Sequence, residues 1–141
     1  MSSGLAFPVT FMLDHSVHIS AWQGDVSVLS PDENIWAKVI DAWEFCMGGP
    51  TSGKLITSTG FVLDDVSSAI KFNDNGKLLA FSQYKNRLPM LLVLCTSSNQ
   101  LIFSSGPYRV IEFNSFINST LDFVDSPIHM PRSLTAEIKI P

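Results

Sequence analysis

The sequence predicts an all-β fold of mainly antiparallel strands, and three observations carry this prediction. Short runs rich in β-branched and aromatic residues recur at even spacing, with turn-forming residues between them. One pair of runs is joined by Asn-Asp-Asn-Gly at positions 73–76, which is a strong hairpin signal. A hairpin-like pattern also occurs twice, at an offset of 43 residues. Together these patterns favour β-meanders.

The expected strands are short and apolar, and most contain valine, isoleucine, threonine or an aromatic residue. The last run alternates apolar and polar residues and stops at a proline, which is typical of an edge strand. In chain order the expected strands are Val9–Leu13, Val17–Trp22, Val26–Leu29, Ile35–Phe45, Leu55–Leu63, Ala69–Phe72, Lys77–Gln83, Met90–Cys95, Gln100–Ser104, Tyr108–Phe113, Thr120–Val124 and Leu134–Ile140.

The clearest hairpin runs from Ile70 to Phe81. Its Asn75-Gly76 pair is favoured where both turn residues need a positive φ. The polar connection at 84–87 and the Ser-Ser-Asn turn at 97–99 then join the next apolar runs. Residues 69–104 are therefore expected to form one continuous antiparallel meander.

The segment from Ser30 to Met47 fits two structures. Ser-Pro-Asp-Glu at 30–33 resembles a helix start, and apolar residues four apart from Ile35 onward could line a helix face. The same residues also alternate as a strand, so periodicity does not decide between them. Residues 30–37 align with residues 73–80, because both read polar acidic turn, two large apolar residues and alanine. This comparison favours a strand over Ile35–Phe45.

A repeat of 43 residues is typical of β-propeller blades, which span about 40–45 residues. A closed propeller needs about four blades, and the chain has room for about three such units. We therefore expect one β-rich domain over residues 1–141, arranged as an open pair of sheets or a partial barrel.

Composition and charge exclude several classes of protein. Of 141 residues, 45% are hydrophobic and 16% are charged, so the chain is not disordered. A net charge of −4 argues against nucleic-acid binding, which needs a basic face. The longest apolar stretch, Leu88–Cys95, is too short to cross a membrane, and the N-terminus lacks a signal-peptide pattern. Neither Cys46 nor Cys95 lies in a metal or redox motif, so we expect a cytoplasmic protein with reduced thiols.

Two motifs resemble ligand sites but depart from them. Gly48–Lys54 matches a phosphate-binding loop, yet Leu55 replaces the hydroxyl residue that would hold magnesium, and a β-rich run follows instead of a helix. A connection between strands is the expected alternative. His15 and His18 are three residues apart, and in a strand they would point to opposite faces. We expect no metal and no cofactor.

The sequence also favours a binding protein over an enzyme. It lacks the Gly-x-Ser-x-Gly hydrolase motif, and neither cysteine has a nearby histidine. An acid–base pair of carboxylates could assemble only in space. By elimination, the candidates for such a pair are Asp41, Glu44, Asp64 and Asp65.

Charge is divided unevenly between the two halves of the chain. Residues 32–65 are acidic, whereas residues 71–109 are mainly basic. An acidic face can steer a basic partner or mimic a phosphate backbone. Tryptophans are expected in the core, but an exposed one would be an interface anchor. The candidate partner-binding residues are therefore Asp32, Glu33, Asp41, Trp43, Glu44, Asp64 and Asp65.

The order of several short motifs resembles a group of small uncharacterised bacterial proteins encoded beside polymorphic toxins, such as Rhs-type effectors of type VI secretion. The resemblance covers about residues 30–130 and lies mostly in turns and strand starts. It implies an immunity protein, a cytosolic binder that occludes the active site of its cognate toxin. The motifs that carry it are Ser30-Pro31-Asp32, Trp36-Ala37, Asp41-Ala42-Trp43-Glu44, Gly49–Gly53, Lys77–Ala80, Tyr108–Glu112 and Asp125–Ile128.

Two alternatives remain beside a toxin-binding role. The low charged fraction would allow strand edges to pair, which would make the protein a structural domain that forms homo-oligomers. A carboxylate-lined pocket would instead indicate an enzyme or a small-ligand domain.

Overall fold

The computed structural model describes residues 12–44 and 48–140. These residues form eleven strands and no helix, and every strand pair is antiparallel, which confirms the predicted fold class. No helix in this part of the chain is long and apolar enough to cross a membrane. The strands are β1 (Val26–Leu29), β2 (Trp36–Glu44), β3 (Thr51–Thr57), β4 (Val62–Ser67), β5 (Lys71–Phe72), β6 (Leu78–Lys85), β7 (Leu88–Cys95), β8 (Gln100–Ser105), β9 (Ile111–Ile117), β10 (Thr120–Asp125) and β11 (Arg132–Glu137).

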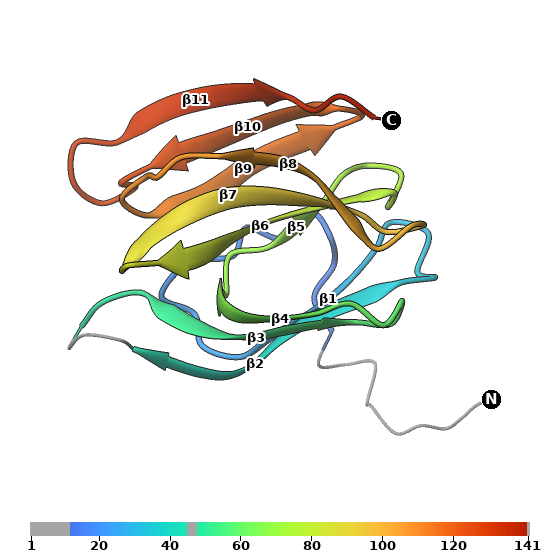
Figure 1. Ribbon diagram of the computed structural model, residues 1–141, viewed down its shortest axis with the longest axis horizontal. Coiled ribbons are helices and arrows are strands. Elements are labelled where there is room, and N and C mark those ends of the chain that lie inside the picture. The colour runs from blue at the N-terminus through green and yellow to red at the C-terminus, as the bar shows by residue number, and fades with distance from the viewer. Residues whose placement is uncertain (1–11, 45–47, 141) are drawn as a thin grey trace.

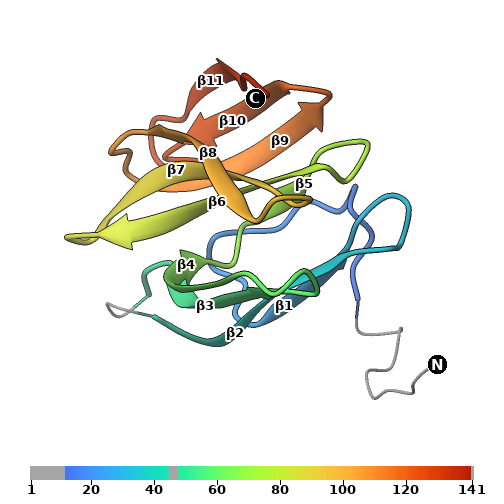
Figure 2. The ribbon, with the colours of Figure 1, turned by 45° about the vertical axis from the view of Figure 1, so that its right-hand side comes forward.

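The strands belong to two open sheets that stack in three layers (Figure 1). The larger sheet has the order β1-β2-β3-β4-β6-β7-β8, with β5 paired to β6, and the smaller sheet has the order β11-β10-β9. The larger sheet folds back on itself where β4 and β6 share a single register pair, Val66 and Gln83. As a result β1–β4 form a lower layer, β5–β8 a middle layer and β9–β11 an upper layer (Figures 1 and 2).

In the middle layer, strands β6 and β7 are mostly buried on both faces, which explains their apolar runs. In β6, Leu79 and Phe81 belong to the core against the lower layer, whereas Leu78 and Ala80 belong to the core against the upper layer. Each large apolar side chain contributes roughly 1.5–3 kcal/mol when fully buried, so these two cores stabilise the stack. The residues of β7 divide in the same way: Leu92 and Leu94 face the lower core, and Leu91 and Val93 face the upper core.

The two hairpin turns aligned at an offset of 43 residues have the same hydrogen bonds. The backbone N–H of Ser30 donates to the carbonyl of Ile35 at 2.8 Å, and that of Asn73 donates to Leu78 at 2.9 Å. The side-chain oxygens of Ser30 and Asn73 accept from the backbone N–H of Ile35 and Leu78, at 3.1 and 3.0 Å. Residues 36–44 are accordingly a strand, as the alignment predicted, and Phe45 at the end of the predicted strand lies outside the described residues.

The fourth residue of each aligned turn takes a positive φ. Glu33 has φ 63° and its counterpart Gly76 has φ 74°. The prediction that Asn75 and Gly76 would both have positive φ is wrong, because Asn75 does not. The hairpin with two consecutive positive-φ residues is the next one, at 86–87. The meander over 69–104 is otherwise confirmed, since β5, β6, β7 and β8 pair in succession.

The strand predicted over Val17–Trp22 is wrong, because this segment is irregular. Its polar groups pair with two layers instead of one neighbouring strand: the backbone N–H of Ala21 donates to the Glu112 carboxylate of β9 at 2.8 Å, and the Ala21 carbonyl accepts from Thr51 of β3 at 2.9 Å. Of the strand predicted over Val9–Leu13, residues 9–11 lie outside the described residues. Leu13 forms an isolated parallel bridge with Val28.

The single strand predicted over Leu55–Leu63 is divided in two. β3 ends at Thr57, and Gly60, with φ 93°, completes a tight turn into β4. β3 also begins earlier than predicted, at Thr51, so much of the glycine-rich stretch is strand and not connection. This rearrangement brings β4 back along β3 and places its residues near the end of β2.

Candidate functional site

The neighbouring strands β2, β3 and β4 are irregular where most of the predicted acidic residues lie. The register shifts between Ile40 and Trp43 in the β2–β3 pair and between Gly53 and Leu55 in the β3–β4 pair. Gly53 permits this close approach, because a Cβ there would lie 2.4 Å from the Ile40 carbonyl oxygen. Bulges of this kind redirect side chains and often occur at functional sites. Asp41, within the first irregularity, has a positive φ of 54°.

Trp43 is the exposed tryptophan of the described chain, with 75% of its surface accessible to solvent. The other two are partly buried and engaged: the Trp22 indole N–H donates to the Gly48 carbonyl at 3.0 Å, and the Lys38 ammonium lies 4.6 Å from the Trp36 ring centre. A large aromatic side chain left in water gains free energy when a partner covers it. The sequence alone does not indicate which of the three tryptophans is exposed to solvent.

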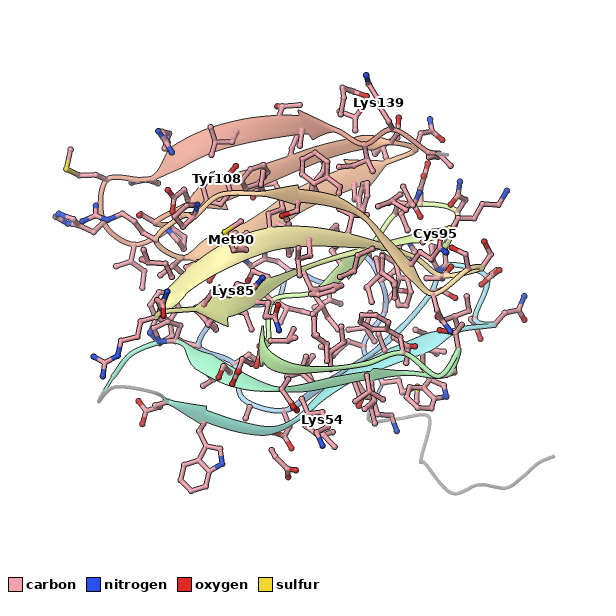
Figure 3. All side chains as sticks on the ribbon, in the orientation of Figure 1. Lys54, Lys85, Met90, Cys95, Tyr108 and Lys139 are labelled. Atoms are coloured by element: carbon pink, nitrogen blue, oxygen red, sulfur yellow. The ribbon has the colours of Figure 1, made fainter. Side chains whose placement is uncertain are left out.

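Trp43 lies at a shallow cleft of about 410 Å³ on the lower layer. The cleft has three carboxylates and one ammonium, so its charge is negative. Lys54 lies on the side of the lower layer that faces away from the middle layer (Figure 3), 3.9 Å from the Asp64 carboxylate. Because both groups are solvent-exposed, this ion pair contributes little to the stability of the fold. The lining residues are Asp41, Trp43, Ser52, Gly53, Lys54, Asp64 and Asp65.

The structure brings four of the seven predicted residues into this cleft and a fifth beside it. Glu44 follows Trp43 in β2, and its carboxylate accepts from the Gly48 backbone N–H at 2.8 Å. Ser52, Gly53 and Lys54 are not among the predicted residues, because the glycine-rich sequence around them is typical of a connection between strands. A lone glycine between strand-forming residues is the signal that could have indicated a close approach there.

Asp32 and Glu33 are not part of the cleft. They lie in the turn before β2, at the end of that strand opposite to Trp43 (Figure 1). Asp32 instead stabilises its own turn, since its carboxylate accepts from the Ser30 hydroxyl at 2.7 Å and from the Asn34 N–H at 3.1 Å. These hydrogen bonds, that from Ser30 foremost, hold the pKa of Asp32 below its usual range.

The two histidines that are three residues apart take different partners. His15 lies 3.3 Å from the Asp14 carboxylate, whereas the His18 ring lies 2.9 Å from the Glu112 carboxylate and 3.2 Å from the Phe113 carbonyl. His18 therefore joins the N-terminal segment to β9. Within residues 12–44 and 48–140, no three side chains of the metal-ligating types are grouped.

The chemistry of the acidic cleft suits recognition of a basic surface. Its carboxylates offer acceptors to lysine and arginine, and the exposed indole can pack on a guanidinium or an apolar side chain. No protein-family model and no curated protein matches the sequence. The role of the cleft is therefore inferred from its own residues.

Proposed function

We propose that the protein is an immunity-type protein that binds a cognate bacterial toxin and neutralises it by covering its active site. Binding would use the Trp43 face, which comprises Asp41, Trp43, Glu44, Asp64 and Asp65. The observation that carries the proposal is a tryptophan, 75% exposed, in a cleft with the carboxylates of Asp41, Asp64 and Asp65. The resemblance to toxin-linked bacterial proteins supports the same role.

The Trp43 face has the two elements that tight protein inhibitors combine. Tryptophan is enriched among the few residues that dominate binding energy, and truncating such an anchor typically costs about 2 kcal/mol or more. The carboxylates around it complement a basic cleft, such as one that binds nucleic acid, and they accelerate association.

Apolar surface continues from the Trp43 face along the lower layer. Val62 of β4 is 57% exposed and is the register partner of Ile56 in β3, which is half-buried. A standard interface needs about 800 Å² from each partner.

The test uses three variants of the tagged full chain in a pull-down from the native host lysate, followed by affinity measurement with the captured partner. Trp43→Ala is expected to weaken binding roughly 30-fold or more. Asp64→Lys is expected to weaken it through charge reversal. Glu33→Lys is the matched control, because it makes the same charge change in an exposed residue of the β1–β2 turn, away from the cleft.

The proposal also requires that the captured partner be toxic when expressed alone and harmless when co-expressed with the wild-type chain. If Trp43→Ala and Asp64→Lys bind the partner as tightly as the Glu33→Lys control, the Trp43 face is not the binding surface. A partner that binds through this face but is not toxic would exclude the immunity role.

A second candidate function, self-association, is favoured by the open edges of both sheets. β8 and β11 end their sheets, and Leu101 of β8 is 45% exposed. β11, however, carries Arg132 and Glu137 at its ends, and charges on edge strands oppose pairing. Analytical ultracentrifugation at high protein concentration tests this candidate, because a strictly monomeric mass would contradict self-association.

A further inference from the structure

A second cleft lies where four segments far apart in the sequence meet. It is bounded by the N-terminal segment, Gly48 before β3, the chain just before β9 and the β10–β11 connection, and its volume is about 450 Å³. This volume is within the range of small-molecule sites, about 300–1,000 Å³. We call it the Arg109 groove; it is lined by Trp22, Gly48, Arg109, Val110, Ser126, Pro127, Ile128 and His129.

A buried carboxylate fixes the backbone that carries Arg109. Asp125 is 6% exposed and accepts from the backbone N–H groups of Arg109 and Val110, at 2.8 and 3.2 Å. The Ser126 N–H donates to the Val110 carbonyl at 2.8 Å. These contacts explain why β9 begins at Ile111 and not at the predicted Tyr108. The guanidinium therefore extends from a fixed backbone.

The charge of Arg109 is left available to a ligand. None of the ion pairs between described residues includes its guanidinium. The nearby Asp125 carboxylate is occupied by the two N–H groups and lies 3.5 Å from the Arg132 guanidinium. A neighbouring cleft that also includes Arg109 contains Asp125 and Arg132, and these two residues pair with each other, so this cleft supplies no further acidic partner for Arg109. No described residue that lines the Arg109 groove is acidic.

The walls of the groove are apolar, and one is exposed to water. Ile128 is 75% exposed, and it lies beside Pro127 and Val110 in the lining. On the other side, the hydrogen bond from the Trp22 indole to Gly48 fixes the ring against the β2–β3 connection. A ligand that covered Ile128 would remove this apolar surface from water.

We propose that the Arg109 groove binds a small amphipathic carboxylate, either an aromatic acid or a medium-chain aliphatic acid. Its apolar part would lie against Trp22 and Ile128, and its carboxylate would pair with Arg109. A planar guanidinium matches a carboxylate with two parallel hydrogen bonds, and the His129 ring can donate another. For a ligand of this size in an open groove, we expect a Kd of about 0.1–1 mM.

The inference is independent of the proposed function, because the Trp43 face does not line this groove. The probe is 4-phenylbutyrate, and its neutral analogue 4-phenylbutyramide is the ligand control. Binding is followed by the indole N–H resonance of Trp22 in ¹H–¹⁵N spectra, which Trp22→Phe assigns. The probe is expected to shift this resonance saturably, and the amide is expected to bind at least about 10-fold more weakly.

Variants then test the role of the guanidinium. Arg109→Gln is expected to weaken binding of 4-phenylbutyrate about 10-fold or more, while the backbone contacts to Asp125 and the dispersion of the spectrum are retained. Lys139→Gln is the matched control: it removes one positive charge from an exposed residue after β11 that does not line the groove. The proposal is overturned if the probe causes no saturable shift, if the amide binds equally well, or if Arg109→Gln binds like the wild type.

Discussion

Replacing Glu33 with glycine should stabilise the protein, because this turn residue is held in a conformation that favours glycine. Its φ is 63°, and its counterpart in the aligned turn is Gly76, with φ 74°. An L-residue in the left-handed region costs roughly 1–2 kcal/mol. Glycine also lowers the free energy of unfolding by roughly 0.4–1 kcal/mol, because it gives the unfolded chain greater conformational freedom. Glu33→Gly should therefore raise the free energy of unfolding by about 0.5–1 kcal/mol.

The reciprocal change should have the opposite effect. Gly76→Ala places a side chain where φ is positive, and its Cβ would lie 3.2 Å from the Ser30 Cβ. The backbone cost and this tight contact should together lower the free energy of unfolding by about 1 kcal/mol or more. Urea denaturation followed by tryptophan fluorescence measures both variants, with the midpoint shifting at constant m value.

Glu33→Ala separates backbone strain from charge. It removes the carboxylate but keeps a Cβ at positive φ, so its stability should stay close to that of the wild type. The difference between the glycine and alanine variants then measures the relief of strain minus the entropic cost of glycine in the unfolded chain. A Glu33→Gly protein that is less stable than Glu33→Ala would refute the reasoning, because the left-handed conformation would then cost less than this entropic term.

Three further outcomes follow from the structure. Gly53→Ala should cost about 1–3 kcal/mol of stability in urea denaturation, because its Cβ would lie 2.4 Å from a backbone oxygen of β2. Burial lowers the pKa of Lys38 below its usual value of 10.5, so the unfolded chain binds more protons than the folded chain between the two pKa values. The free energy of unfolding of the wild type should therefore rise relative to that of Lys38→Met as pH increases from neutral towards 10.5. A difference in unfolding free energy that does not change with pH would contradict this. Hydrogen bonds from Ser97 and then Ser98 lower the pKa of the Cys95 thiol, so Ser97→Ala, in a Cys46→Ser background, should slow alkylation by iodoacetamide at neutral pH.

The meander from β5 to β8 could be predicted because its determinants are local. Each turn contains residues that bend the chain, and each apolar run is long enough to form one strand. The aligned turns could be predicted for the same reason, since Ser30 and Asn73 both satisfy the backbone with their own side chains. Glycine at one of these turns and glutamate at the other hid the fact that their φ angles agree.

The N-terminal segment could not be predicted, because its structure depends on distant polar groups. Its residues favour strand locally, but Ala21 is bound on one side by Glu112 and on the other by Thr51. These partners lie in different layers, and no local pattern indicates that they meet. Hydrogen bonds to partners in β9 and β3 thus take the place of the strand pairing that the local β propensity favours.

The candidate site was predicted only in part, because closeness in sequence is not closeness in a sheet. Asp32 and Asp41 are near in sequence, but β2 is extended, at about 3.3 Å per residue, and separates them. Asp64 is farther away along the chain, yet β3 and β4 return it to the same cleft as Asp41. The irregular register that turns these residues towards each other depends on Gly53.

The two proposed surfaces share one contact, and that contact determines which variants can separate them. The Glu44 carboxylate accepts from the Gly48 N–H, and the Gly48 carbonyl accepts from the Trp22 indole. A change at Glu44 would therefore alter the Trp43 face and, through Gly48, a wall of the Arg109 groove. Asp64 and Arg109 each line only one of the two. Charge reversal at Asp64 should thus leave carboxylate binding intact, and Arg109→Gln should leave partner binding intact, so either proposal can fail without the other.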